Sequence, residues 1–345
     1  MPFIHHHTKS DGRNLWLFSQ QEREYIFTND LPPLAQAATP EKRWHPLREE
    51  YVFFNPGRNN RTLNPPPEYN PLAPVQIDGF PGEIPVTDFE IAVFDNRWPS
   101  LSMPVEDLED GHTRSVGKCE VVVYSTQDHG SLADFSKDHL VMLLDVWSER
   151  YEDLISNPNI SFVMPFENRG QGVGVTLPHP HGQIYAFEDT PRVIQRQCDG
   201  NQKSKYFEGL LANPDPKFVV AENDNALVYC PEFGRYPFET WVLPRELVSS
   251  PKYLSKAQKQ DFAALLKEHV ARLDKLFGEP MDYVMWVSFP PKEFKDSWPF
   301  HIQFWPMKRG AGKVKQLASV EQITQLFMCD ILPEAAAQSL REVVL

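Results

Sequence analysis

The nine residues from 177 to 185 read LPHPHGQIY and bring together side chains that can do chemistry. Alternate side chains of an extended backbone point the same way, so His179, His181, Gln183 and Tyr185 would share one face. The two prolines cannot donate to a sheet ladder, which favours an edge or terminal position where this face is open to a ligand. A neutral imidazole is able to attack phosphorus near pH 7. We therefore predict that His181 is a nucleophile that forms a phosphoramidate, and that the amide of Gln183 donates to a phosphate oxygen.

A glycine-rich segment precedes the histidines. Residues 168–176 read NRGQGVGVT, with glycine at alternate positions. Backbone amides in such a loop are suited to an anion, so the amides near Gly172 and Gly174, together with Thr176, are candidate phosphate ligands. The GxGxG pattern matches neither a P-loop nor a dinucleotide fingerprint, and its value comes from its place before the histidines. A phosphate cradle followed by a histidine strand indicates phosphoryl or nucleotidyl transfer.

Composition and charge limit the function classes. The chain has 345 residues, 41% hydrophobic and 23% charged, as in a soluble globular protein. The net charge of −13 opposes binding to nucleic acid or an anionic membrane, so an anionic substrate would need a locally basic site. The candidate basic residues are Arg58, Arg61, Lys308, Arg309, Lys313 and Lys315. Four scattered cysteines without a CxxC pair fit reduced thiols, and we expect a cytoplasmic protein. We expect His5, His6 and His7 to lie in an exposed, flexible terminus.

The order of predicted elements repeats along the chain. A strand at 89–99, a second at 119–124, a helix at 132–154 and a third strand at 160–165 precede His181. The corresponding segments 225–237, 239–243, 256–277 and 283–287 precede a strand that contains His301. Both helices carry apolar residues at helical spacing. Because paired strands follow each helix, we predict an α+β fold in which an antiparallel sheet is backed by helices and one unit is used twice.

The motifs resemble those of a known family. HPHGQIY at 179–185, with FENRG at 166–170, is similar to the active-site signature of galactose-1-phosphate uridylyltransferases, in the histidine triad superfamily. RWHPLREEYVFFNPGRNNR at 43–61, VFDNRWPSL at 93–101 and YSTQDHGSL at 124–132 resemble further family segments in the same order. The resemblance implies an N-terminal extension at 1–45 and two histidine-triad-like halves, 46–200 with the nucleophile and 201–345.

The same resemblance assigns residues and partners. It implies that His181 is uridylylated and that Gln183 assists it. The other implied contacts to phosphate or nucleotide are Arg58, Arg61, Asn96, Asn168 and Thr176. The implied substrates are a nucleotide sugar and a sugar 1-phosphate, and the implied assembly is a homodimer.

Both metal sites of the family are altered in this sequence. Asn70 and Ala73 stand where the family's zinc-binding CPxC element has cysteines, which leaves only His129 and His179, a poor tetrahedral set. We expect hydrogen bonds or packing to replace zinc, so that no cofactor is required. At the second metal site His301 persists, whereas ligand positions hold the residues Gln197, Val287 and Gln303. We expect that site to be empty and His301 to be a hydrogen-bonded structural residue.

The hexose-binding pair also differs. The family reads the hexose with a Tyr-Glu pair, and a gapless count from Arg309 places Glu321 and Gln322 there. Unmet polar groups discriminate strongly between substrates, so the sugar specificity is expected to change. We include Gln303 and Gln322 among the candidate substrate-binding residues.

Three functions follow from these observations. The first is a nucleotidyltransferase that passes UMP from a UDP-sugar to a sugar 1-phosphate by a ping-pong reaction through His181. The second is a hydrolase or phosphorylase of nucleotide conjugates or dinucleoside polyphosphates, in which water or phosphate discharges the same intermediate. The third is a non-catalytic nucleotide-binding homologue. Product analysis with and without a sugar phosphate separates the first two, and nucleotide binding without turnover would favour the third.

Overall fold

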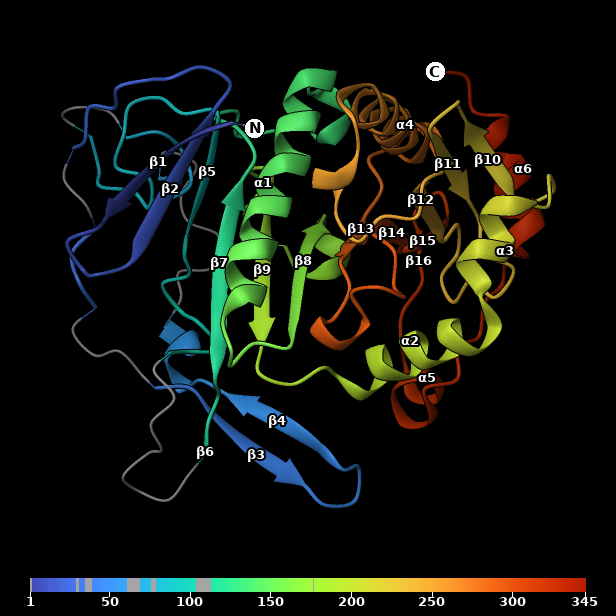
Figure 1. The fold of residues 1–345 in the computed structure, drawn as a ribbon, viewed down its shortest axis with the longest axis horizontal. Helices are drawn as coiled ribbons and strands as arrows, with labels where there is room; N and C mark the ends of the chain where they lie inside the picture. Colours follow the sequence, from blue (N-terminus) through green and yellow to red (C-terminus); the bar gives the residue numbers. More distant parts are fainter. Residues whose placement is uncertain are drawn as a thin grey trace. The chain divides into compact units, whose positions relative to one another are not determined.

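The structure is a computed structural model that describes residues 2–28, 31–34, 39–60, 69–75, 79–103, 113–175 and 177–345 (Figure 1). The chain divides into two compact units. The first contains residues 1–129, 149–165 and 176–191, and the second contains residues 130–148, 166–175 and 192–345. Two candidate site residues, Arg61 and Thr176, lie outside the described residues. The domain boundaries at residues 45 and 200 stay predictions, because compact units need not coincide with the halves of a duplication.

An antiparallel sheet forms the centre of the first unit. Its strands, in spatial order, are β1 (Phe3–Thr8), β2 (Asn14–Ser19), β5 (Ile91–Asp95), β7 (Gly117–Val123) and β9 (His181–Phe187). Leu15 and Leu17 of β2, Phe94 of β5, and Val121 and Val123 of β7 share one buried apolar cluster. This cluster fixes the strand register, because a slip of one residue would move the apolar side chains to the opposite face.

The N-terminal histidines belong to this sheet. His5, His6 and His7 lie in β1, which pairs with β2 along its whole length. The His7 ring stacks on Phe27 with a centroid distance of 4.0 Å. The expectation of a flexible terminus is therefore wrong, because ladder hydrogen bonds and ring contacts hold this segment.

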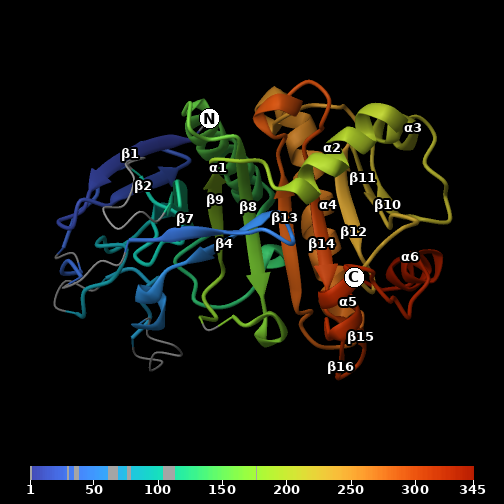
Figure 2. The ribbon, with the colours of Figure 1, turned by 90° about the horizontal axis from the view of Figure 1, so that it is seen from below.

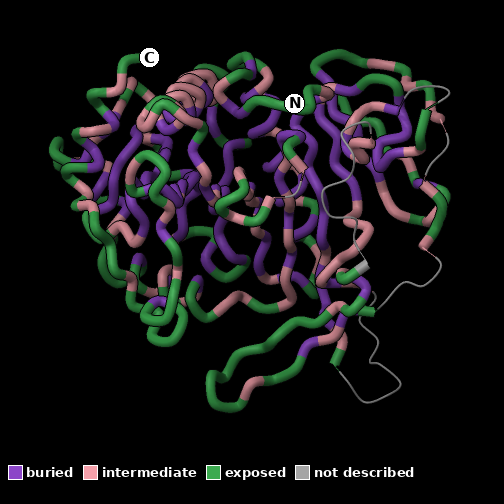
Figure 3. The backbone as a smooth tube through the Cα atoms, turned by 180° about the vertical axis from the view of Figure 1, so that it is seen from behind, coloured by how far each residue is buried: buried purple, intermediate pink, exposed green. Residues whose placement is uncertain are grey.

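A second, three-stranded sheet in the first unit has the order β4-β3-β6. Its strands are β3 (Glu41–His45), β4 (Glu50–Phe54) and β6 (Thr113–Arg114). Every residue of β4 is exposed, including Tyr51, Phe53 and Phe54. In Figure 3 the hairpin of β3 and β4 is drawn mostly in green and pink, the colours of exposed and intermediate residues. A 3-10 helix at Pro56–Asn60 follows β4.

The second unit also contains a series of antiparallel strands. After the end of β8 (Phe162–Arg169), the strands follow in spatial order as β13 (Tyr283–Ser288), β14 (His301–Pro306), β12 (Thr240–Pro244), β11 (Ala226–Tyr229) and β10 (Val219–Glu222) (Figure 2). A small hairpin is formed by β15 (Lys308–Gly310) and β16 (Lys313–Val314).

Helices cover these strands. Helix α4 (Lys256–Lys275) packs against β10, β11 and β12, and α6 (Pro333–Arg341) packs against β10. The remaining helices are α1 (Lys137–Ser156), α2 (Arg192–Ser204), α3 (Tyr206–Ala212) and α5 (Ser319–Thr324), with short 3-10 helices at Leu132–Asp134, Gln171–Val173, Pro251–Tyr253 and Lys292–Phe294. Within the described ranges, no helix has the length and apolarity needed to cross a bilayer.

The two helices predicted from apolar spacing are confirmed. Leu140, Leu143, Leu144 and Trp147 of α1 are buried, as are the apolar residues of the stripe on α4. Ser255 begins α4 as the N-cap of a capping box with Gln258, which satisfies backbone amides of the first turn. The α+β class, with an antiparallel sheet backed by helices, is also confirmed.

Candidate active site

Strand β9 presents the predicted functional face. Buried and half-buried residues alternate along it, with His181, Gln183 and Tyr185 half-buried and Gly182 and Ile184 buried. The alternation follows from the pleat, because Ile184 packs into the core while its neighbours point to the other side. The predicted sharing of one face therefore holds for the three residues within β9.

His179 differs from that prediction. It precedes β9 and its exposed fraction is 1%. Its Nε2–H donates to the carbonyl oxygen of Ser125 at 2.8 Å, and its Nδ1 accepts from Nδ2 of Asn70 at 2.9 Å. His179 is therefore a buried, doubly bonded residue rather than part of the open face.

The His181 ring is held in one tautomer. Its Nδ1–H donates to the carbonyl oxygen of His179 at 2.7 Å, and no partner for Nε2 occurs among the described residues. A carbonyl oxygen can only accept, so the proton of the neutral ring lies on Nδ1 and the Nε2 lone pair is free. Burial lowers the pKa of His181, and the bond to His179 opposes this in part. The ring is therefore a neutral base and a potential nucleophile at pH 7.

Gln183 is oriented by Asn96. The Oδ1 of Asn96 accepts the backbone N–H of Trp98 at 2.8 Å, which leaves its Nδ2 to donate to Oε1 of Gln183 at 3.5 Å. The amide nitrogen of Gln183 then remains to donate to another group. The sequence predicted separate contacts for Asn96 and Gln183, whereas the structure brings the two side chains together.

Arg58, in the 3-10 helix at Pro56–Asn60, contacts a later part of β9. Its Nη1 donates to the carbonyl oxygen of Trp98 at 3.1 Å, to Oγ of Ser100 at 3.0 Å and to the hydroxyl of Tyr185 at 3.4 Å. Tyr185 is four residues beyond His181, or about 13 Å along a strand. Arg58 is therefore anchored at the Tyr185 end of the face. Sequence reasoning placed Tyr185 on this face but missed its role as an anchor for Arg58.

The residues around His179 do not fit a zinc site. Both of its ring nitrogens are engaged, one with the amide of Asn70 and the other with the carbonyl of Ser125. His129 is exposed, and its Nδ1 lies 2.7 Å from the carboxylate of Asp128. Among the residues that the structure describes, no group of three or more His, Cys, Asp or Glu side chains could hold a metal ion.

The glycine loop differs from the expected anion cradle. The amide of Gly172 donates to Oδ2 of Asp282 at 3.3 Å, and that of Gly174 donates to the carbonyl oxygen of Gln171 at 3.0 Å. Gly170 has φ of +93°, and a Cβ there would lie 1.7 Å from Oδ1 of Asp282. The amide of Gly172 thus binds a carboxylate of the protein itself and is not free to bind a substrate phosphate in the described conformation.

Asn168 is half-exposed at the end of β8, where it lies opposite Val284 of β13. Asn168, Gly172 and Gly174 belong to the second unit, and His181, Gln183, Asn96 and Arg58 belong to the first.

His301 is the second unit's counterpart of His181. Its Nδ1–H donates to the carbonyl oxygen of Pro299 at 3.0 Å, and its Nε2 lies 2.9 Å from Nε2 of Gln303, which donates. The Oε1 of Gln303 accepts from Nε1 of Trp305 at 3.2 Å. Burial lowers the pKa of His301 to about 4. The expected hydrogen bonding of His301 is confirmed, and its structural role stays a prediction.

The two glutamines proposed to bind substrate have different surroundings. Gln303 is 2% exposed and lines a pocket of about 480 Å³ in the second unit. Gln322 is exposed on α5, and the adjacent Glu321 forms a buried ion pair with Lys315 at 2.7 Å. Nothing in the described contacts brings Gln322 to Gln303.

The later basic candidates are mostly paired. Lys308 contacts Glu279 at 3.3 Å, Arg309 contacts Asp330 at 2.6 Å, and Lys315 pairs with Glu321. These cations neutralise local carboxylates, so they do not form the free basic site that the overall charge requires for an anionic substrate.

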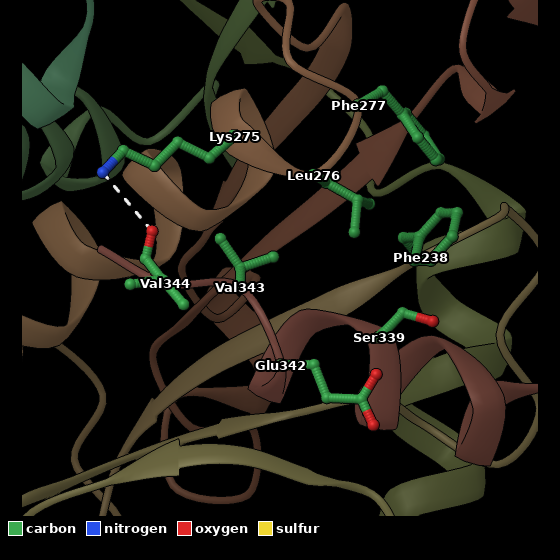
Figure 4. Close-up of a pocket in the computed structure, with 8 residues that line it drawn as sticks. All are labelled: Phe238, Lys275, Leu276, Phe277, Ser339, Glu342, Val343 and Val344. Atoms are coloured by element: carbon green, nitrogen blue, oxygen red, sulfur yellow. Dashed lines mark hydrogen bonds between the residues drawn. The ribbon is translucent and has the colours of Figure 1, made fainter.

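A different hollow of about 410 Å³ lies beside the C-terminal residues (Figure 4). Phe238, Leu276 and Phe277 form its apolar wall, and Nζ of Lys275 donates to the carbonyl oxygen of Val344 at 3.4 Å. Its one lysine is thus directed to the chain's own backbone, and this hollow presents no group that resembles the His181 face.

Comparison with protein families and known proteins agrees with the order of the motifs. Residues 29–191 match the family model described as "Galactose-1-phosphate uridyl transferase, N-terminal domain", and residues 203–344 match the corresponding C-terminal domain. A galactose-1-phosphate uridylyltransferase of Thermotoga maritima is 34% identical over 318 residues, which cover 88% of this chain and 98% of that protein.

Solved structures show the same fold. A structure described as a uridylyltransferase superposes with a TM-score of 0.75 at 24% identity and covers 87% of this chain and 97% of its own. An ADP-glucose phosphorylase from Arabidopsis thaliana with bound ADP-glucose has a TM-score of 0.67 at 23% identity, with coverage of 89% and 99%.

Proposed function

The chain belongs to the galactose-1-phosphate uridylyltransferase family, and we propose that it transfers UMP from a UDP-sugar to a sugar 1-phosphate through a uridylyl group on Nε2 of His181. The observation that supports this most strongly is the state of the His181 ring. Its Nδ1–H is bonded to the carbonyl of His179, and Nε2 has no described partner. This arrangement supports Nε2 as the attacking nitrogen.

In the first half-reaction, Nε2 attacks the α-phosphorus of the UDP-sugar. A P–N bond forms, the bond from the α-phosphorus to the bridging oxygen breaks, and the sugar 1-phosphate leaves with that oxygen. The ring becomes positively charged, and its Nδ1–H stays bonded to the carbonyl of His179 at 2.7 Å. The carbonyl dipole stabilises this charge, so no proton needs to leave the ring.

In the second half-reaction, a phosphate oxygen of the incoming sugar 1-phosphate attacks the same phosphorus. A new P–O bond forms, the P–N bond breaks, and the electron pair returns to Nε2. The amide of Gln183, which Asn96 orients, donates to a non-bridging oxygen while charge develops on it. Arg58 at the Tyr185 end supplies positive charge to a more distant part of the nucleotide sugar.

We propose that this reaction requires no metal ion. The family resemblance implies a zinc site, but the residues at that site do not fit one, because Asn70 and the Ser125 carbonyl occupy both nitrogens of His179. The same two bonds position the His179 backbone, whose carbonyl holds His181. Hydrogen bonding thus replaces the structural contribution that a metal would make.

A homodimer and a cytoplasmic location are also part of the proposal. The exposed aromatic residues Tyr51 and Phe53 on one face of β4, with Trp44 of β3 at 49% exposure, form an apolar surface that a second copy of the chain would cover. Four free cysteines fit a reducing compartment. Sedimentation of the purified protein, beside a variant with Trp44→Ser and Tyr51→Ser, which lie opposite each other on the hairpin, tests the dimer: the variant is expected to shift toward monomer.

Mass spectrometry of the intact protein after incubation with UDP-glucose tests the transfer. We expect an added, acid-labile uridylyl group in the wild-type protein and in His129→Ala, whose histidine is exposed, and none in His181→Ala. Addition of a sugar 1-phosphate should discharge the group with formation of a new UDP-sugar. Absence of any adduct with a panel of nucleoside diphosphate sugars would refute the proposal.

The phosphorylase alternative differs only in the acceptor. The Arabidopsis protein with a similar fold is described as an ADP-glucose phosphorylase. Discharge of the adduct by inorganic phosphate, faster than by any sugar 1-phosphate and with release of a nucleoside diphosphate, would assign that activity instead. Discharge by water alone, with free UMP as product, would indicate a hydrolase.

A further inference from the structure

We propose that the second unit binds a nucleotide, an aromatic base that carries a phosphate group, in the pocket of about 480 Å³ between α2, α3 and the face of β12 and β14. Every residue that lines this pocket belongs to the second unit, and none belongs to the His181 face. The inference therefore concerns a second ligand site, and it does not depend on transfer at His181.

Aromatic rings form the walls of the pocket. Tyr206 of α3 lies 5.3 Å from Phe233 and 6.1 Å from Trp241 of β12, measured between ring centroids. Phe233 and Trp241 are 5.8 Å apart. Phe233 is 52% exposed at the pocket although it is a large apolar side chain. Such rings offer faces against which a planar base can stack.

Two arginines supply positive charge to the same pocket. Arg196 of α2 and Arg235, in the loop between β11 and β12, both line it, and neither guanidinium forms an ion pair with a described residue. The Arg235 guanidinium lies 5.0 Å from the ring centroid of Trp305 and 5.1 Å from that of Phe327. These rings contact the guanidinium, and its N–H groups donate to no described residue, so they are available to phosphate oxygens.

The carboxylate of Glu239 also lines the pocket, but hydrogen bonds reduce its repulsion of a bound phosphate. Its Oε2 accepts the backbone N–H groups of Arg235 at 2.7 Å and Tyr236 at 3.3 Å, and its Oε1 accepts Nε1 of Trp241 at 3.2 Å. These three donors offset the carboxylate charge and hold the loop that carries Arg235.

The ligand of this pocket would bind without covalent reaction. Gln303, which lines the pocket, donates to Nε2 of His301, so the nitrogen that corresponds to the proposed nucleophile has no free lone pair. The second unit would thus keep the binding of a nucleotide while the first performs transfer.

Isothermal titration of the full-length protein with UMP and with AMP tests the site. We expect two binding events per chain for at least one of these nucleotides. Arg235→Gln and Phe233→Ala should each weaken one event about tenfold or more, or about 1.4 kcal/mol. Arg58→Gln should weaken only the other event. Arg309→Gln, which changes an exposed arginine outside the pocket, should leave both unchanged.

Three further probes define the ligand class. Inorganic phosphate and uridine should each bind the pocket at least tenfold more weakly than the nucleotide, because each lacks one half of the recognised structure. Glucose 1-phosphate serves as a non-aromatic phosphate ester. The proposal is overturned if Arg235→Gln and Phe233→Ala, with wild-type circular dichroism, retain both events, or if glucose 1-phosphate competes as well as the nucleotide.

Arg235→Lys keeps the test decisive if the glutamine variant fails to fold. It retains the charge but loses the planar stacking, and we expect intermediate affinity. The failure of transfer at His181 would leave these results unaffected, because the titration measures binding and its variants lie in the second unit.

Discussion

The Nδ1 of His181 lies 2.7 Å from the carbonyl oxygen of His179, two residues earlier in the chain. The same bond recurs in the second unit, where Nδ1 of His301 lies 3.0 Å from the carbonyl oxygen of Pro299. Both rings therefore have the same tautomer. They differ at Nε2, which accepts from Gln303 in the case of His301 and has no described partner in the case of His181. The free Nε2 is one feature that distinguishes the proposed nucleophile from His301, and the neighbouring amide of Gln183, oriented by Asn96, is a second.

The pH dependence of uridylylation should reflect the lowered pKa of His181. Burial disfavours the charged ring, so the ring stays neutral until the pH falls below 6.5. The single-turnover rate of adduct formation is expected to be flat from pH 8 to about 6.5 and to fall only at lower pH. Rapid-quench measurement with UDP-glucose gives this profile. An inflection at or above pH 7 would contradict the described environment.

Replacement of Asn70 should destabilise the first unit. Asn70→Leu removes the donor to Nδ1 of His179, which leaves a buried acceptor without a partner. The expected loss in the free energy of unfolding is about 1–3 kcal/mol. Urea unfolding measures it, with Asn159→Ala at an exposed position as the control. We also expect slower adduct formation, because the His179 backbone holds His181; an unchanged rate would show that Asn70 does not position the site.

Replacement of Gln303 should affect stability without creating a second reactive histidine. Gln303→Leu removes the donor to His301 and the acceptor for Trp305, and each unmet buried group costs about 1–3 kcal/mol. Gln322→Leu, on the exposed face of α5, should change stability by about 0.5 kcal/mol or less. Peptide mapping of the adduct should still locate the uridylyl group only on His181. A uridylyl group on His301 would show that a free Nε2 alone is enough to make that histidine react.

The local pattern of the sequence was sufficient to predict strand β9 and helices α1 and α4. The periodicities of 2 for a strand and 3.6 for a helix depend only on neighbouring residues. The His181 face and the apolar stripe near Trp147 could therefore be predicted. The burial of His179 was not, because it depends on Asn70, 109 residues away in the chain. The capture of the Gly172 amide by Asp282 likewise joins residues 110 positions apart.

Two helices of the second unit were missed for a related reason. Helix α2 has the polar sequence RVIQRQCDGNQKS, in which only Ile194, Cys198 and Asn201 are buried. These buried positions share one helical face, so the segment is amphipathic, but it is so polar that an analysis based on apolar stripes did not assign it as a helix. The pocket beside it joins α2 and α3 to the loop that carries Arg235, and such convergence of distant segments has no local sequence signature.

Acid should destabilise the protein through its buried histidines. The pKa of His301 is lowered to about 4 by burial, whereas an unfolded histidine titrates near 6.5. Between these values the unfolded chain binds a proton that the folded chain does not, so stability falls as the pH falls from 6.5 to 4 and levels off below. His301 alone contributes roughly 3 kcal/mol to this loss.

Urea unfolding at pH 7.5, 6 and 5 measures that loss. His301→Gln should have a shallower dependence on pH than the wild-type protein, whatever its absolute stability. His129→Gln, at an exposed position, should retain the wild-type slope. Equal slopes for all three proteins would be inconsistent with a buried, neutral His301.

A buried ion pair between Arg150 and Glu120 lies beside strand β9 and gives the last prediction. Arg150 of α1 donates to both carboxylate oxygens of Glu120 at 3.0 and 2.7 Å, and the Arg150 guanidinium lies 3.9 Å from the ring centroid of Trp16. Glu120 is on β7 opposite Ile184 of β9. Arg150→Met would leave the Glu120 carboxylate buried without its counter-charge and should cost about 3–5 kcal/mol. The double variant Arg150→Met with Glu120→Gln should recover part of this loss, because the remaining amide needs no counter-charge, and a double-mutant cycle in urea gives the coupling energy.

The same ion pair should affect the reaction. Because β7 pairs with β9 along its length, the single variant Arg150→Met should also slow adduct formation at His181 under conditions where it is still folded. Additive single effects in the cycle would mean that the two side chains act independently and that the ion pair does not hold the strand.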